Sequence, residues 1–119
     1  GFWSGRERAT LREQLERADA QIAAGRLVRA GTGDALELLL DAKARWPGDA
    51  RAQQRLSLLA AKLEAMGTVA LERGNLEEAG AHFEAALKAE PGRPLARERL
   101  KAVEESVRER SRDKVIHSP

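Results

Sequence analysis

The sequence lacks cysteine, which excludes disulfide bonds and thiolate metal sites and leaves the cellular compartment open. Aromatic residues make up only 3% of its 119 residues, and alanine and leucine supply most of the apolar set. These residues form helices readily, so the composition predicts an all-α protein. No apolar run approaches the roughly 18 residues that span a bilayer, and no signal peptide is visible. A first residue other than Met indicates a processed or excised piece, although a tag remnant would look the same.

The net charge is also small, at +2, because 19 acidic residues balance most of the 21 lysines and arginines. The two signs alternate along the chain, as on the solvent-facing sides of amphipathic helices. No basic stripe suits a phosphate backbone, so nucleic acid is not the expected partner. The alternative is a basic surface on the last predicted helix, which glutamates interrupt. Its basic residues are Arg97, Arg99, Lys101, Arg108 and Arg110.

Start and stop signals divide the chain into five helices. Ser4, Asp34 and Asn75 are each followed three positions later by glutamate, which is the pattern of a capping box. Glycines and Pro-Gly pairs supply the stops. No segment alternates with period two over a useful length, so no strand is expected. The predicted helices cover residues 4–24, 34–45, 49–73, 76–89 and 94–112.

Apolar spacing indicates how the later helices pack. In the third helix, Leu58, Ala61 and Val69 form a second apolar face beside the main stripe, so we expect cover from two sides. The fifth helix has one apolar stripe and an otherwise charged surface, which is typical of a cap. That stripe consists of Ala96, Leu100, Val103 and Val107.

The sequence repeats itself after 44 residues, since Pro47-Gly48 recurs as Pro91-Gly92. Two helices that cross at a steep angle need small residues where their backbones approach and a large ring beside them. A glycine closes the turn between them, and a proline ends the second helix. The residues that meet these packing demands are Ala35, Leu39, Ala42, Pro47, Gly74, Ala79, Phe83, Ala86 and Pro91.

These residues resemble the tetratricopeptide repeat (TPR) family, a helix-turn-helix unit of about 34 residues. Counting back from Pro91 puts Gly67 at the small position of the first helix, and the second helix carries its signature positions as well. Leu63 and Ala70 stand where the family often has tryptophan and tyrosine. The first unit matches less completely, with a stretched turn. The chain looks like a bacterial TPR domain with two repeats and a terminal capping helix, of the kind that follows a membrane-spanning helix in larger envelope proteins.

The resemblance implies a non-catalytic module that binds a peptide or partner protein in a concave groove. Family members that hold a C-terminal carboxylate use basic and amide side chains, whereas Glu64 and Thr68 stand at two of those positions here. A ligand should therefore meet a mixed-charge surface. The groove residues that the resemblance implies are Arg12, Glu16, Asp19, Glu64, Thr68, Leu71, Glu72, Arg97, Lys101 and Glu104.

The sequence gives little support for a catalytic function. The segment 31–34, GTGD, follows a helix and lacks the Lys-Ser or Lys-Thr pair of a phosphate-binding loop. His82 has only His117 as a second histidine, too few for a metal site of three or more ligands. No serine or threonine lies near a His–carboxylate pair in the sequence. We therefore expect no enzyme, no cofactor and no metal.

Some alternatives stay open. Phe2 and Trp3 could be a hydrophobic staple, an aromatic belt beside a membrane span or a partner anchor. Trp46 could be a lid over the joint between repeats or a binding anchor. The apolar stripe of the fifth helix could pair copies of the chain, which would make it an oligomerisation domain of a larger, membrane-anchored protein.

The expected boundaries are an N-terminal segment at 1–9, a TPR-like domain at 10–112 and a flexible tail at 113–119. The expected location is the bacterial envelope, with the cytoplasm as the alternative. A membrane would be met only through a segment outside this chain.

Overall fold

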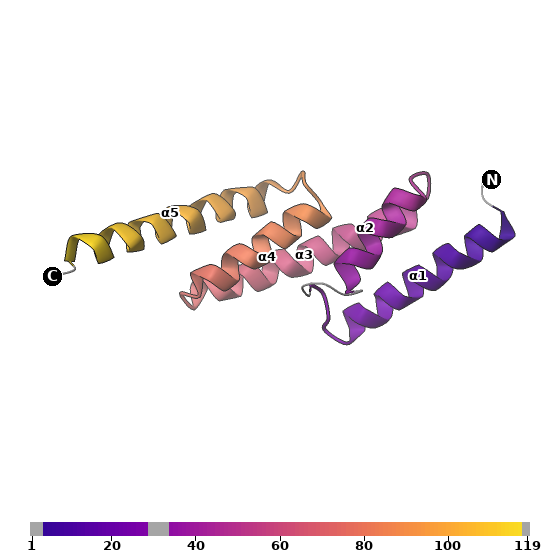
Figure 1. Ribbon diagram of the computed structural model, residues 1–119, viewed down its shortest axis with the longest axis horizontal. Coiled ribbons are helices and arrows are strands. Elements are labelled where there is room, and N and C mark those ends of the chain that lie inside the picture. Colours follow the sequence, from indigo (N-terminus) through magenta and orange to yellow (C-terminus); the bar gives the residue numbers. More distant parts are fainter. Residues whose placement is uncertain (1–3, 29–33, 118–119) are drawn as a thin grey trace. The chain divides into compact units, whose positions relative to one another are not determined.

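The computed structural model describes residues 4–28 and 34–117, with side chains up to residue 114 (Figure 1). Over these residues the chain forms α-helices and no strand, which confirms the all-α prediction. The helices are α1 (Gly5–Ala23), α2 (Ala35–Arg45), α3 (Ala50–Glu72), α4 (Leu76–Ala89) and α5 (Pro94–His117). Phe2, Trp3 and the glycines of the 31–34 segment lie outside the described residues.

The chain divides into two compact units, Gly1–Leu59 and Ala60–Pro119. The first unit contains α1, α2 and the beginning of α3, and α1 packs against α2. The second contains the rest of α3 with α4 and α5, and α4 packs against α5. The division therefore falls within α3, which is one continuous helix (Figure 1).

Two of the three predicted caps form. The Ser4 hydroxyl accepts a hydrogen bond from the Glu7 N–H (3.1 Å), and the Glu7 carboxylate accepts one in return from the Ser4 N–H. Asp34 likewise accepts from the N–H of Glu37 at 2.8 Å. Asn75 makes no such bond, because its ψ of 77° departs from the extended value of 165° at Ser4. Its side-chain amide donates to the Glu78 carboxylate instead, at 3.4 Å.

Gly25 and Gly74 close equivalent turns. Both have a φ of 78°, a left-handed conformation that glycine adopts without steric cost. The Gly74 N–H donates to Leu71 O, and the next N–H reaches back to Ala70 O at 2.9 Å. The same pair of bonds recurs after Gly25. Each turn therefore satisfies carbonyl groups at a helix end in a Schellman motif.

Among the described residues of the first unit, the buried side chains are apolar except for Gln14 and Asp34. The Gln14 side-chain amide donates to Leu38 O at 2.7 Å and to the Asp41 carboxylate at 2.8 Å. Trp46 is also buried, and the Arg45 guanidinium lies 4.4 Å from the centroid of its ring. The packing residues predicted for this unit, Ala35, Leu39 and Ala42, are fully buried, and Pro47 is exposed at the end of α2.

The core of the second unit shows why small residues alternate with a ring. A Cβ atom added to Gly67 would stand 2.7 Å from the ring of Phe83, which is itself fully buried. Ala79 and Ala86 are fully buried on the same helix as Phe83. The backbone of α3 therefore approaches α4 at a position that only glycine fits, as expected for closely packed helices.

Two sequence expectations differ from the structure. The second face of α3 is not covered: Leu58 is 71% exposed, Val69 is 44% exposed and Ala61 is also exposed. The buried leucines of α3 all belong to its main stripe, so helices of this chain pack on that side. The fifth helix also continues to His117, beyond its predicted end at residue 112. Two residues before the predicted end, Arg110 forms an exposed ion pair with Glu77 of α4.

Candidate interaction surfaces

The groove residues predicted in the first unit lie on one face of α1. Arg12, Glu16 and Asp19 are all exposed. The Asp19 carboxylate binds Arg55 of α3 through two hydrogen bonds of 2.9 and 3.0 Å. Within the described part of the chain, Arg12 and Glu16 have no ion-pair partner.

Glu64 is buried and forms an ion pair that the sequence did not reveal. Its carboxylate accepts two hydrogen bonds from the Arg93 guanidinium, at 3.2 and 3.0 Å. Arg93 also donates to Glu90 at 2.8 Å. Hydrogen bonding from Arg93 lowers the pKa of Glu64, and the two carboxylates raise the pKa of Arg93 above its ordinary value. Glu64 thus joins α3 to the start of α5 and does not stand free in a groove.

Thr68 is also engaged within the second unit. Its hydroxyl donates to the Glu64 carbonyl oxygen at 2.9 Å and accepts a hydrogen bond from Arg99 of α5. Leu71, one turn further along α3, is half-buried. The structure therefore brings Glu64 against Arg93 and Thr68 against Arg99. Neither arginine was among the predicted groove residues.

The other predicted groove residues of this unit are exposed. Arg97, Lys101 and Glu104 are exposed on α5, and Glu72 is exposed at the end of α3. Arg97 donates to the carbonyl oxygen of Pro91 at 2.8 Å. Arg97, Lys101 and Glu104 follow one another at helical spacing, so they lie on one side of α5. We refer to these three residues as the mixed-charge face.

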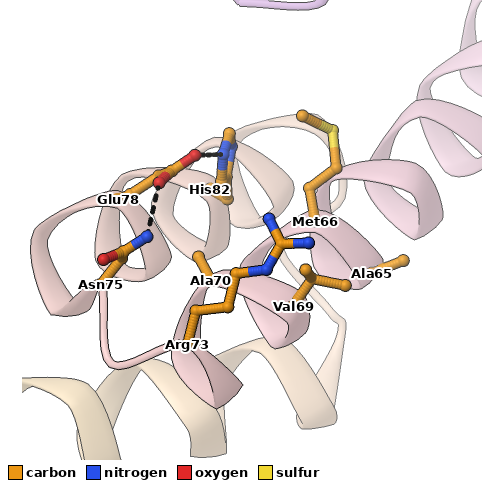
Figure 2. A pocket seen from close by; sticks show the side chains of 8 residues that line it. All are labelled: Ala65, Met66, Val69, Ala70, Arg73, Asn75, Glu78 and His82. Carbon is orange, nitrogen blue, oxygen red and sulfur yellow. Dashed lines mark hydrogen bonds and ion pairs between the residues drawn. The ribbon is translucent and has the colours of Figure 1, made fainter.

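A pocket of about 330 Å³ opens between α3 and α4, on a surface that the apolar spacing predicted to be covered (Figure 2). Its apolar part includes Met66 and Val69, which are 41% and 44% exposed. Arg73 extends across it toward Met66, and His82 lies on its α4 side (Figure 2). The residues that line this α3–α4 pocket are Ala65, Met66, Val69, Ala70, Arg73, Asn75, Glu78 and His82.

The polar rim of the α3–α4 pocket is partly satisfied by its own side chains. The Glu78 carboxylate accepts from the Asn75 amide at 3.4 Å and lies 3.6 Å from His82 Nε2 (Figure 2). Among the described residues, Arg73 has no ion-pair partner. The pocket therefore offers apolar side chains and one uncompensated positive charge.

The predicted self-association residues separate into two groups. Ala96 and Val103 are buried in the second unit, and Val103 lies 3.5 Å from where a Cβ on Gly80 would stand. Leu100 and Val107 are half-buried and line a groove of about 460 Å³ between α4 and α5. Only these two therefore offer apolar surface to another molecule.

The described part of the chain contains no candidate metal site. Among the described residues, no group of three or more histidines and acidic residues has the arrangement of a metal site. Asp34, the last residue of the 31–34 segment, caps α2. In the described helices no stretch is long and apolar enough to cross a bilayer.

Comparisons of the chain with protein-family models, with curated proteins and with solved structures find no match.

Proposed function

We propose that this chain is a non-catalytic, TPR-like helical-hairpin module that binds a peptide or partner protein. The hairpin of α3 and α4 supports the proposal, since Gly67 packs on Phe83 and Gly74 closes the turn. Packing of this kind holds the backbone rigidly and leaves the solvent-facing side chains free to recognise a partner.

The observation that carries the proposal is the pair of internal bonds beneath the mixed-charge face. Arg93 binds Glu64, and Arg99 binds Thr68, so α3 and α5 are held in a fixed register. Lys101 and Glu104 stay exposed on α5. Charges on a rigid surface give specificity and faster association with a complementary partner.

The test is a peptide selection against the full chain. A random peptide library is displayed on phage, and the affinity of each selected peptide is measured by calorimetry. Lys101→Glu reverses an exposed charge of the mixed-charge face and should weaken binding by about fivefold or more. Lys88→Glu reverses an equally exposed charge on α4 and is the matched control.

Thr68→Arg places a second cation against Arg99 and should abolish binding without a change in oligomeric state. Circular dichroism verifies that each variant remains helical. Equal affinities for the Lys101 and Lys88 variants, or no peptide selected, would contradict the proposed surface.

A second proposal is that the chain is an oligomerisation domain of a larger protein, and the half-buried Leu100 and Val107 favour it. Leu100→Glu should then dissolve the oligomer while helicity is kept. Sedimentation at several concentrations measures this, and a monomer at every concentration excludes self-pairing.

A further inference from the structure

We propose that the α3–α4 pocket is the docking site for an acidic amphipathic helix of a partner protein. The proposal stands apart from the mixed-charge face, because it rests on Met66, Val69 and Arg73, and no residue of that face lines the α3–α4 pocket (Figure 2). The chemistry of the proposed partner helix follows from the way α4 covers a similar apolar surface on α5.

The packing of α4 on α5 is the internal example. Leu100 and Val103 of α5 have the same three-residue spacing as Met66 and Val69 of α3. Val103 is 3% exposed because it lies over Gly80 of α4. A small residue in the covering helix thus admits the apolar side chain.

The same example includes a charge pair. Glu77 lies three residues before Gly80 on α4, and its carboxylate binds Arg110 of α5. The pKa of Glu77 is lowered, first by a hydrogen bond from the backbone N–H and then by hydrogen bonding to Arg110. To α5, the covering helix α4 therefore presents a small residue, Gly80, and a nearby glutamate, Glu77.

On α3, Met66 and Val69 are not covered by a helix in this way. Met66 and Val69 are each more than 40% exposed, whereas Val103 is buried. From Met66 to Arg73 the row extends about 10 Å, at 1.5 Å per residue, so two to three turns of a second helix would cover it. Exposed apolar surface with a polar rim is typical of an interaction site.

Charge decides which helix fits. Among the described residues, Glu78 is the only carboxylate that lines the α3–α4 pocket, and it already accepts a hydrogen bond from Asn75 and lies 3.6 Å from His82 Nε2. Arg73 is exposed and, among the described residues, has no ion-pair partner. A docking helix with a glutamate or aspartate beside its apolar stripe would complement that cation, as Glu77 complements Arg110.

The sequence contains a single methionine, so the pocket has a built-in reporter. The full chain is labelled with ¹³C-methyl methionine, and the Met66 methyl signal is followed by NMR. The probe is a capped, helix-constrained peptide with the sequence of Leu76–Ala89, which presents the glycine and glutamate of the internal example. We expect this peptide to shift the Met66 signal saturably.

Variants then test the charge and the surface. Arg73→Glu should weaken the peptide by about fivefold or more, and a peptide with Glu77→Lys should recover binding to that variant. Val69→Glu should remove binding. Leu95→Glu is the matched control, because Leu95 is 40% exposed in the same unit but lies outside the α3–α4 pocket, and it should bind as the parent chain does.

Three results overturn the proposal. The first is no shift of the Met66 signal at millimolar peptide. The second is equal affinity of the parent chain and Arg73→Glu. The third is a Met66 shift that depends on the concentration of the chain alone, which would make a second copy the occupant. Since Lys101 belongs to the mixed-charge face and does not line the α3–α4 pocket, its variant tests the proposed function independently.

Discussion

Of the described glycines, only Gly67 has no room for a side chain. Its neighbour is the fully buried ring of Phe83. Gly80 differs, because a Cβ there would make an ordinary contact with Val103 at 3.5 Å. Both glycines lie inside helices, where alanine is favoured by about 0.5–1 kcal/mol.

This contrast predicts opposite effects for the same substitution. In Gly67→Ala the overpacking cost of about 1–3 kcal/mol exceeds the helix-forming gain, so the variant should be less stable. Gly80→Ala should be as stable as the parent chain or more stable, by up to about 1 kcal/mol. Urea unfolding measures both, and a stabilised Gly67→Ala would show that Phe83 can move aside.

The buried ion pair of Glu64 predicts a pH dependence. The pKa of Glu64 is lowered in the folded chain, so the pair stabilises the fold above the ordinary value of 4.5. That stability is lost as the pH falls through the lowered value. Glu64→Gln should therefore be less stable than the parent chain near neutral pH, and the difference should shrink on acidification.

Free energies of unfolding at a series of pH values measure the Glu64 effect. Glu72→Gln, an exposed change near the end of the same helix, is the control and should leave the profile unchanged. A parent–variant difference for Glu64→Gln that stayed constant down to pH 2 would contradict the assignment.

Single residues differ in how far the sequence predicted their role. The burial of Phe83 between Ala79 and Ala86 was predictable, because packing imposes this spacing of small and large residues. Arg93 and Gln14 were not, since each finds its partner more than twenty residues away through polar atoms that follow no periodicity. Helical spacing indicates which side chains avoid water, but it does not show which polar groups meet.

At the scale of helices, capping distinguishes α2 from α4. Asp34 accepts a hydrogen bond from a first-turn N–H of α2, whereas Asn75 makes no such bond to α4. Asp34→Ala should cost about 1 kcal/mol or more, and Asn75→Ala only a few tenths. Urea unfolding of the two variants measures the difference, and equal losses would show that Asn75 contributes in another way.

Helix bounds were the most predictable feature, because caps, glycines and prolines act locally. The end of α5 was not predictable in this way. Beyond residue 112 the sequence has charge without an apolar period, and the ion pair between Arg110 and Glu77 is tertiary. The exposure of Met66 and Val69 was missed for a related reason: an apolar stripe predicts a partner surface without showing that this chain supplies it.

At the scale of the whole molecule, each of the two units has a core of its own. The core of the second unit contains Phe83, and that of the first contains Leu11 and Leu39. Destabilising one core should therefore open that unit in preference to the other, since local unfolding follows local packing.

Hydrogen exchange of Gly67→Ala tests this independence. Amide protection should fall further in α4 and α5 than in α1 and α2, because the added methyl group disturbs only the second core. An equal loss of protection in all four helices would show that the continuous α3 makes the chain unfold as a single cooperative body.

The two Schellman turns have a consequence for chirality. At a φ of 78° an L-residue is strained, but the mirror-image residue finds its preferred backbone region there. Chemical synthesis with D-alanine in place of Gly74 would thus retain the bend and restrict the unfolded chain, a route to added stability that no genetically encoded residue offers at this position.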